Sequence, residues 1–163
     1  MSLVKRMLSL IALGVFAMLS MNANAQLADK KVLTLEAAKK IAVAAEAEAR
    51  KNNWNVAIAI LDDGGHQLQF IRMDGATPAN AAIAVEKGRT AAMSRRATGM
   101  WEKLVQDGRT GMLNMPGILP VQGGLPILVD GNCVGGIGVS GVQSHQDDQI
   151  AQAGIDALLG KAS

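Results

Sequence analysis

The sequence predicts an α+β domain, in which helices pack on an antiparallel sheet. Two glycine-containing turn signals, at residues 62–65 and 130–132, each separate two apolar runs of the kind that form strands. Segments with helical spacing of apolar residues stand before, between and after these hairpins. The predicted order is helix, two strands, two helices, two or three strands and helix, in a single domain over residues 26–163.

Capping residues locate the predicted helices. Thr34 is expected to cap the first helix, with Glu36 in its first turn, and this helix is expected to end near residues 52–53. Thr77 followed by Pro78 is a cap with proline at the first helical position, which predicts the start of a long alanine-rich helix. That helix is expected to reach about Arg96, and two shorter helices are expected over residues 101–106 and from about 146 to 159.

The first hairpin is predicted in VAIAILDDGGHQLQFIRMDG, residues 56–75. We predict two strands joined by a two-residue turn at the Gly-Gly pair, because glycine reaches positive φ without a steric penalty. His66 lies just past this turn, and Arg72 follows the second strand. The hairpin is therefore the first place to look for chemistry.

The second hairpin is predicted from residues 125–129 and 133–139, joined by an Asp-Gly-Asn turn. Glycines interrupt its second strand, which predicts a bulge or a close backbone approach. The preceding segment, 107–126, is rich in glycine and proline and is expected to be an ordered loop with a short strand at 118–121. Loops of this length in a compact domain are often functional.

The first 25 residues are predicted to be a signal peptide. Lys5 and Arg6 precede an apolar stretch over residues 7–21, and the small-x-small pattern Ala-Asn-Ala ends at Ala25. The apolar stretch is short for a membrane span, so no span is expected after cleavage. We expect a periplasmic or secreted protein that begins near Gln26, with a retained N-terminal anchor as the alternative.

Charge and composition restrict the classes of molecule that this protein is expected to bind. The chain has 16 basic and 14 acidic residues, and removal of Lys5 and Arg6 with the leader leaves 14 of each. This balance argues against nucleic acid as a partner. Tyrosine is absent and small apolar residues must fill the core, so subunit association is expected to add stability. The single cysteine, Cys133, is expected to be a buried thiol without an internal disulfide.

Few residues fit a catalytic or metal template. The chain has no His-Glu-x-x-His, Cys-x-x-Cys or P-loop pattern, and its only histidines are His66 and His145. Both are candidate cofactor ligands, and His66 is also the candidate metal ligand. If both approach one cleft, they form a two-histidine site; otherwise His66 stands in solvent at a strand start and His145 belongs to a capping region.

Two further features are open to two interpretations each. Gly136 and Gly138 lie in the pattern Gly-x-Gly-Val-Ser-Gly, which indicates an anion site or a strand packed under a helix. The basic residues in the second half of the long helix indicate a solvated face or a clamp for carboxylates. These residues are Lys87, Arg89, Arg95 and Arg96.

Three segments of the chain resemble one known family. The segments LDDGGHQLQFIRMDGATPANAAIAVEKGRTAA, PGILPVQGGLPILVDGNCVGGIGVSG and QDDQIAQAGIDAL are similar to those of the GlcG/HbpS family, also called the haem-degrading domain family. This family includes the C-terminal domain of PduO-type corrinoid adenosyltransferases. The resemblance covers nearly all of residues 33–160. It implies a profilin-like fold with a five-stranded antiparallel sheet flanked by helices, and homo-oligomers that are often octamers.

The resemblance also implies a ligand. Some relatives bind haem through a histidine, and His66 in the DDGGH block is the matching position. One secreted relative binds haem and informs a sensor kinase, which makes a sensor protein a possible partner here. Iron-binding acidic pairs of a relative, spaced Glu-x-x-Glu or Asp-x-x-Glu, have no match, since Glu46 and Glu48 are only two apart.

The first functional hypothesis is a periplasmic haem-binding protein that acts in haem sensing, transport or breakdown. Haem would lie in a cleft or between subunits, bordered by the 62–75 hairpin and strand 135–141, with His66 as axial ligand. Guanidinium groups pair bidentately with carboxylates and would hold the haem propionates. The candidates for this role are Arg72, Arg95 and Arg96.

Two alternatives belong to other classes. One is an isomerase or lyase acting on a small organic acid, with His66 or Asp63 as base and Arg72 holding the carboxylate. Backbone amides of residues 136–141 would then stabilise an enolate. The other is a non-catalytic oligomeric module that binds a partner protein.

Overall fold

The computed structural model describes residues 28–160, so the predicted signal peptide, residues 1–25, lies outside the described residues. Within the described range, the residues from Lys31 onward form one compact unit. Its elements are α2 (Leu35–Lys51), β1 (Ala57–Asp62), β2 (Gln67–Arg72), α3 (Pro78–Ser94), α4 (Thr98–Gln106), the 3-10 helix η2 (Thr110–Asn114), β3 (Gly124–Val129), β4 (Asn132–Ser140) and α5 (Ser144–Leu159). The predicted order of helices and strands is confirmed.

The strands form one antiparallel sheet in the order β2-β1-β4-β3. Four strands, not five, make up this sheet in the described residues, so the expectation of a fifth strand is wrong. The segment 118–121 stays outside the sheet because its backbone bonds elsewhere: Leu119 N–H donates to Thr90 Oγ1 at 2.9 Å. Pro116 and Pro120 flank this contact and offer no backbone N–H for a strand ladder.

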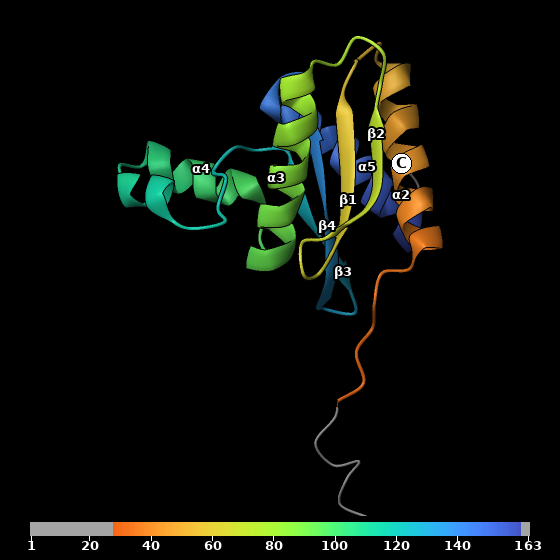
Figure 1. The fold of residues 1–163 in the computed structure, drawn as a ribbon, viewed down its shortest axis with the longest axis horizontal. Coiled ribbons are helices and arrows are strands. Elements are labelled where there is room, and N and C mark those ends of the chain that lie inside the picture. The colour runs from red at the N-terminus through yellow and green to blue at the C-terminus, as the bar shows by residue number, and fades with distance from the viewer. Residues whose placement is uncertain (1–27, 161–163) are drawn as a thin grey trace, which may run out of the picture. The chain divides into compact units, whose positions relative to one another are not determined.

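Helices cover both faces of the sheet, with α3 on one face and α2 and α5 on the other (Figure 1). Alternation along β1 explains the two layers. Ile58 and Ile60 point to the α2–α5 side, where the larger core lies, while Ala57, Ala59 and Leu61 point to α3. Thr34 and Thr77 cap α2 and α3 as predicted, each accepting a backbone N–H at 3.2 Å.

Helix α3 lies against the backbone of β4 because β4 has glycines where side chains would otherwise separate them. A Cβ at Gly138 would stand 2.0 Å from Ala84 O and 2.3 Å from Gly88 N. A Cβ at Gly136 would stand 2.4 Å from Gly88 O. Both β4 glycines are buried. The predicted close backbone approach is confirmed, and α3 takes the space that an anion site would need.

The first hairpin closes differently from the prediction. Asp62 and His66 form its last backbone pair, with Asp62 N–H donating to His66 O at 2.8 Å, so three residues form the connection instead of two. Gly65 has φ of +81°, in the left-handed region that a three-residue turn of this kind requires. The Asp62 side chain favours this longer turn by accepting from Gly64 N–H at 2.9 Å.

The second hairpin is tighter than predicted. Only Asp130 and Gly131 connect β3 to β4, both at positive φ, which is the conformation of a two-residue hairpin turn. Ile127 pairs with Gly135 and Leu128 with Cys133, so Val134 is an extra residue in β4, which confirms the bulge predicted in this strand. Cys133 is half-buried, so the expectation of a buried thiol is wrong; its Sγ lies 3.3 Å from Gly135 O.

Three helix boundaries differ from the predictions. Helix α3 ends at Ser94, because Arg95 adopts a left-handed φ of 57°. Helix α4 begins at Thr98, where Gly124 N–H donates to Thr98 Oγ1 at 2.9 Å and ties the helix to the sheet. Helix α5 begins at Ser144, so His145 lies inside its first turn. Of the helices among residues 28–160, none is long and apolar enough to cross a membrane.

Candidate functional site

The turn between β1 and β2 presents His66 to solvent on a fixed backbone. The imidazole is 82% exposed, and its Nδ1 lies 3.3 Å from Asp62 Oδ1. The same carboxylate oxygen accepts the His66 backbone N–H at 2.8 Å. A carboxylate beside one ring nitrogen orients an imidazole so that its other nitrogen is available to a metal. The arrangement therefore suits His66 as a ligand.

The charge of Asp62 is stabilised by this turn. Burial alone would raise the pKa of Asp62, but the backbone N–H groups of His66 and Gly64 and the nearby imidazole outweigh burial. The pKa of Asp62 is therefore below the ordinary value of an aspartate. At neutral pH the Asp62 carboxylate is charged and accepts the backbone N–H groups of Gly64 and His66.

In the Asp62→Asn variant, the free energy of unfolding is expected to change less between pH 6 and pH 2 than it does in the wild type. A lowered native pKa gives a stabilisation that is present above the ordinary aspartate pKa and is lost as pH falls through the native value. The asparagine oxygen can accept the same two N–H bonds without titrating. Free energies of unfolding measured with urea between pH 2 and pH 6 would check this. The same change of free energy with pH in both proteins would contradict it.

Helix α3 supports the turn from behind. Arg89 Nε donates to Gly65 O at 3.2 Å, and its guanidinium also pairs with Glu86 on the same helix. Met93, one turn further along α3, is exposed, with its Sδ 3.1 Å from the position that a Gly65 Cβ would take. The candidate site is thus a turn bearing one histidine, seated on an arginine and a methionine.

Other predicted residues lie far from this turn. Arg72 pairs with Ala57 at the opposite end of β2, and its Nε donates to Ala76 O at 2.9 Å. Arg72 lies six positions after His66 along an extended strand, or about 20 Å at 3.3 Å per residue. His145 follows β4, whose Ser140 also pairs with Ala57, so it lies at the same distant end. The two histidines do not share a cleft within one chain.

The remaining basic residues divide into two groups. Arg95 and Arg96 are exposed just beyond Met93, at the end of α3 that supports the turn. Lys87 is instead 2% exposed, so the solvated face is wrong for this residue, and the carboxylate that it holds belongs to the chain itself. Its Nζ donates to Asp147 Oδ2 at 2.8 Å and to Val139 O at 3.0 Å.

The buried Lys87–Asp147 pair joins α3 to the first turn of α5, and sequence reasoning missed it. Burial raises the pKa of Asp147, and the hydrogen bond and charge of Lys87 oppose that rise. Sixty residues separate the partners, so no local spacing reveals the pair. The sequence offered one signal of burial for Lys87: it directly precedes Gly88, the α3 glycine whose backbone contacts β4.

A polar pocket of about 350 Å³ opens beside this pair, between α4 and the start of α5. Gln122 connects its two carboxylates: Gln122 N–H donates to Glu102 Oε2 at 2.7 Å, and Gln122 Nε2 donates to Asp148 Oδ2 at 2.6 Å. Burial raises the pKa of Asp148, and the Glu102 charge adds to the rise. The Asp148 carboxyl therefore retains a proton to a higher pH than an exposed aspartate does.

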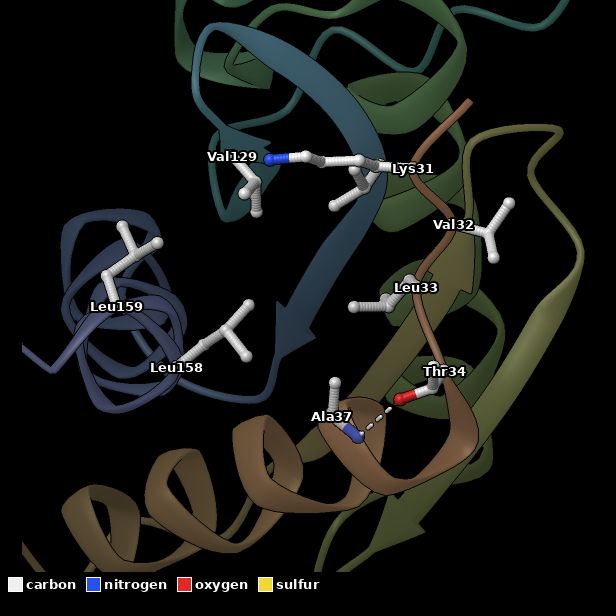
Figure 2. A pocket seen from close by; sticks show the side chains of 9 residues that line it. Lys31, Val32, Leu33, Thr34, Ala37, Val129, Leu158 and Leu159 are labelled. Atoms are coloured by element: carbon white, nitrogen blue, oxygen red, sulfur yellow. Dashed lines mark hydrogen bonds between the residues drawn. The ribbon is translucent and has the colours of Figure 1, made fainter. Parts of the chain in front are cut away.

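An apolar groove of about 430 Å³ lies at the other end of α5 (Figure 2). Leu33, Val129 and Leu158 point into it from three separate segments, and Lys31 crosses its rim to pair with Asp130. The lining contains no histidine, cysteine or methionine. Elsewhere in the described part of the chain, no group of three or more His, Cys, Asp or Glu side chains is placed to hold a metal ion.

The comparisons with known proteins agree with this fold. A family model described as haem degrading protein HbpS-like matches residues 33–156. Protein GlcG of Escherichia coli strain K12 is 46% identical over 111 residues, which cover 68% of this chain and 83% of GlcG. HbpS of Streptomyces reticuli, solved as a double mutant, is 36% identical with a TM-score of 0.75, over 82% of this chain and 91% of that chain.

A haem complex is also among the similar solved structures. PduOC, crystallised with haem, is 27% identical to this chain with a TM-score of 0.71, over 78% of this chain and 95% of PduOC. The family model spans α2 through most of α5, including the His66 turn and both hairpins. The resemblance inferred from the three sequence segments is confirmed, and the chain belongs to the HbpS-like family of haem-degrading proteins.

Proposed function

We propose that this protein binds haem, with His66 as the axial ligand to the iron. The observation that carries the proposal is the His66–Asp62 pair on a closed turn: an exposed imidazole whose Nδ1 faces a charged carboxylate. Haem, when bound, would supply an iron centre for electron transfer or for binding small ligands. The residues of the turn hold the imidazole, and Asp62 keeps its orientation.

The family supports haem as the ligand. The matching family model is described as haem degrading, and PduOC was solved in complex with haem. The apolar groove at the far end of α5 is a poorer place for the iron, because its lining offers no imidazole, thiolate or thioether. His66 is therefore the better assignment in this chain.

The position of the His66 turn indicates which arginines are suited to bind the haem propionates. Arg95 and Arg96 follow the end of α3 that lies at the His66 turn, so they are proposed to meet the propionates. Arg72 is less suited to this role within one chain, because it lies at the opposite end of β2. The exposure of His66 favours a macrocycle covered in part by a second copy of the chain, which accords with the expected homo-oligomer.

The organic-acid isomerase or lyase is disfavoured. That hypothesis places Arg72 with His66 or Asp63 in one site, yet the length of β2 separates them within a chain. It also uses backbone amides of residues 136–141, but β4 pairs with β1 and β3 on its two sides. A partner-binding module remains compatible with haem binding, since a sensor protein would read the loaded state.

Secretion is part of the proposal. The basic pair, apolar stretch and Ala-Asn-Ala pattern of residues 1–25 support export and cleavage before Gln26. A periplasmic or secreted location would bring the protein to haem outside the cytoplasm, where sensing, transport or breakdown are the roles open to it.

A hemin titration tests the proposal. The protein without residues 1–25 is expected to give a shifted, stoichiometric Soret band, and His66→Ala is expected to weaken hemin binding at least about 10-fold because it removes the axial ligand. His145→Ala is the matched control, since this exposed histidine lies at the other end of the sheet. Equal binding by the wild type and His66→Ala would remove His66 from the site.

A further inference from the structure

We propose that Arg89 is a positioning residue for His66, acting through the turn between β1 and β2. This inference rests on the proposed function, because it concerns how the iron ligand is held. Arg89 lies on α3, and its Nε donates to the carbonyl oxygen of Gly65, the residue directly before His66. The bond joins the turn to a helix that is fixed on the sheet.

The inner side of the turn is held by Asp62. One carboxylate oxygen accepts the N–H groups of Gly64 and His66, and Gly65 N–H donates to Asp62 O at 3.0 Å. These bonds close the turn at the end of the two strands, and none of them joins it to α3. The Gly65 carbonyl oxygen instead accepts the hydrogen bond from Arg89 Nε on α3.

Close packing supports the same contact. A Cβ at Gly65 would stand 2.8 Å from Arg89 Cγ and 3.1 Å from Met93 Sδ. Since glycine has no Cβ, the aliphatic part of Arg89 and the Met93 thioether lie directly on the turn backbone. Arg89 thus contacts the turn through both its stem and its Nε, which restricts movement of the turn relative to α3.

The guanidinium is itself held in place. Glu86 pairs with it from the preceding turn of α3, which leaves the Nε of Arg89 directed at Gly65. Helix α3 cannot shift easily, because its backbone lies on Gly136 and Gly138 of β4. The sequence of contacts therefore runs from the sheet through α3 and Arg89 to the backbone of His66.

Removal of the Arg89 guanidinium is expected to increase the mobility of the His66 side chain while the domain stays folded. In Arg89→Met the aliphatic stem is kept and the donor to Gly65 O is lost, while the Asp62 bonds remain. Groups that orient a metal ligand typically change affinity 10–100-fold when they are removed. We expect Arg89→Met to weaken hemin binding about 10-fold, and Arg89→Lys, which keeps a cationic donor, to recover part of this loss.

The test combines hemin titration with NMR relaxation of the His66 imidazole in hemin-free protein. Arg50→Met is the matched control, because Arg50 also pairs with a glutamate on its own helix but lies on α2. Arg89→Met is expected to increase His66 motion, with Arg89→Lys intermediate and Arg50→Met like the wild type. Wild-type binding and His66 motion in Arg89→Met would overturn the inference.

Loss of haem ligation by His66 and loss of the Arg89 contact would give different results. If the wild type binds no hemin, or His66→Ala binds as tightly as the wild type, haem ligation by His66 fails, whereas the relaxation data still report on Arg89. If hemin binds through His66 and Arg89→Met changes neither readout, only the role of Arg89 fails. If both Arg89 variants fail to fold, Arg89 is a fold residue and the positioning role is overturned.

Discussion

Replacing Gly138 with alanine is expected to destabilise the domain by about 3 kcal/mol or more, at the upper end for overpacked sites. The new Cβ would stand 2.0 Å from Ala84 O and 2.3 Å from Gly88 N. Both atoms belong to the backbone of α3, so no side-chain rotation can relieve the overlap. The helix must move away from β4 and lose packing over the whole α3 face. Urea unfolding monitored by circular dichroism measures the loss.

Gly111→Ala is the control for the intrinsic effect of a glycine replacement. No atom lies within 4 Å of the position its Cβ would take, and its φ is not in the left-handed region. Its stability is expected to stay within about 0.5 kcal/mol of the wild type. A Gly138→Ala protein as stable as Gly111→Ala would show that α3 is not seated on β4 in this way.

The Lys87→Met variant is expected to lose about 3–5 kcal/mol, because it leaves the buried Asp147 carboxylate without its cation. Both side chains of the pair are 2% exposed, so water cannot replace the missing partner. Asp147 retains the Val142 N–H as a donor at 3.3 Å, which is too little to stabilise a buried charge alone. Equilibrium unfolding at pH 7 measures the loss.

The loss should shrink in acid. Burial already raises the pKa of Asp147, and removal of the Lys87 charge raises it further. A raised native pKa gives a contribution that is fully present below the ordinary aspartate pKa and is lost as pH rises through the native value. The difference between Lys87→Met and the wild type is therefore expected to be smallest near pH 4 and largest above neutrality.

Two further variants isolate the charge effect. Lys103→Met removes an exposed lysine that pairs with Asp107 at 3.0 Å, and pairs of that kind contribute at most about 1 kcal/mol. A combined Lys87→Met and Asp147→Leu variant is expected to recover part of the loss, since no unpaired charge remains. Equal free energies of unfolding for Lys87→Met and Lys103→Met would show that the buried pair stabilises the fold no more than an exposed pair does.

Local signals predicted the elements of this fold well. Thr34 and Thr77 cap their helices because hydroxyls before apolar stripes satisfy free N–H groups, which is a rule of short range. The glycines of β4 likewise predicted close packing. The expected strand at 118–121 failed because a distant side chain, Thr90, takes the backbone N–H of Leu119. Periodicity along a chain cannot reveal such a competitor.

The candidate site was predicted in part, for the same reason. His66 was found because it follows a glycine turn, and the turn does present its imidazole to solvent. Arg72 was placed beside it because both belong to one hairpin, yet an extended strand carries its two ends apart. Arg89 was identified only as one of several basic residues, since its contact with Gly65 depends on how α3 crosses the sheet.

The backbone contact between α3 and β4 has a consequence for how the surface beside the His66 turn could be altered. The helix is fixed by atoms that every residue type shares, so its outer side chains are free to vary without moving it. Arg89 and Met93 occupy such outer positions next to the His66 turn. Exchanging a few side chains there would change what the turn can hold while the scaffold keeps its shape, which makes this corner a natural place for redesign.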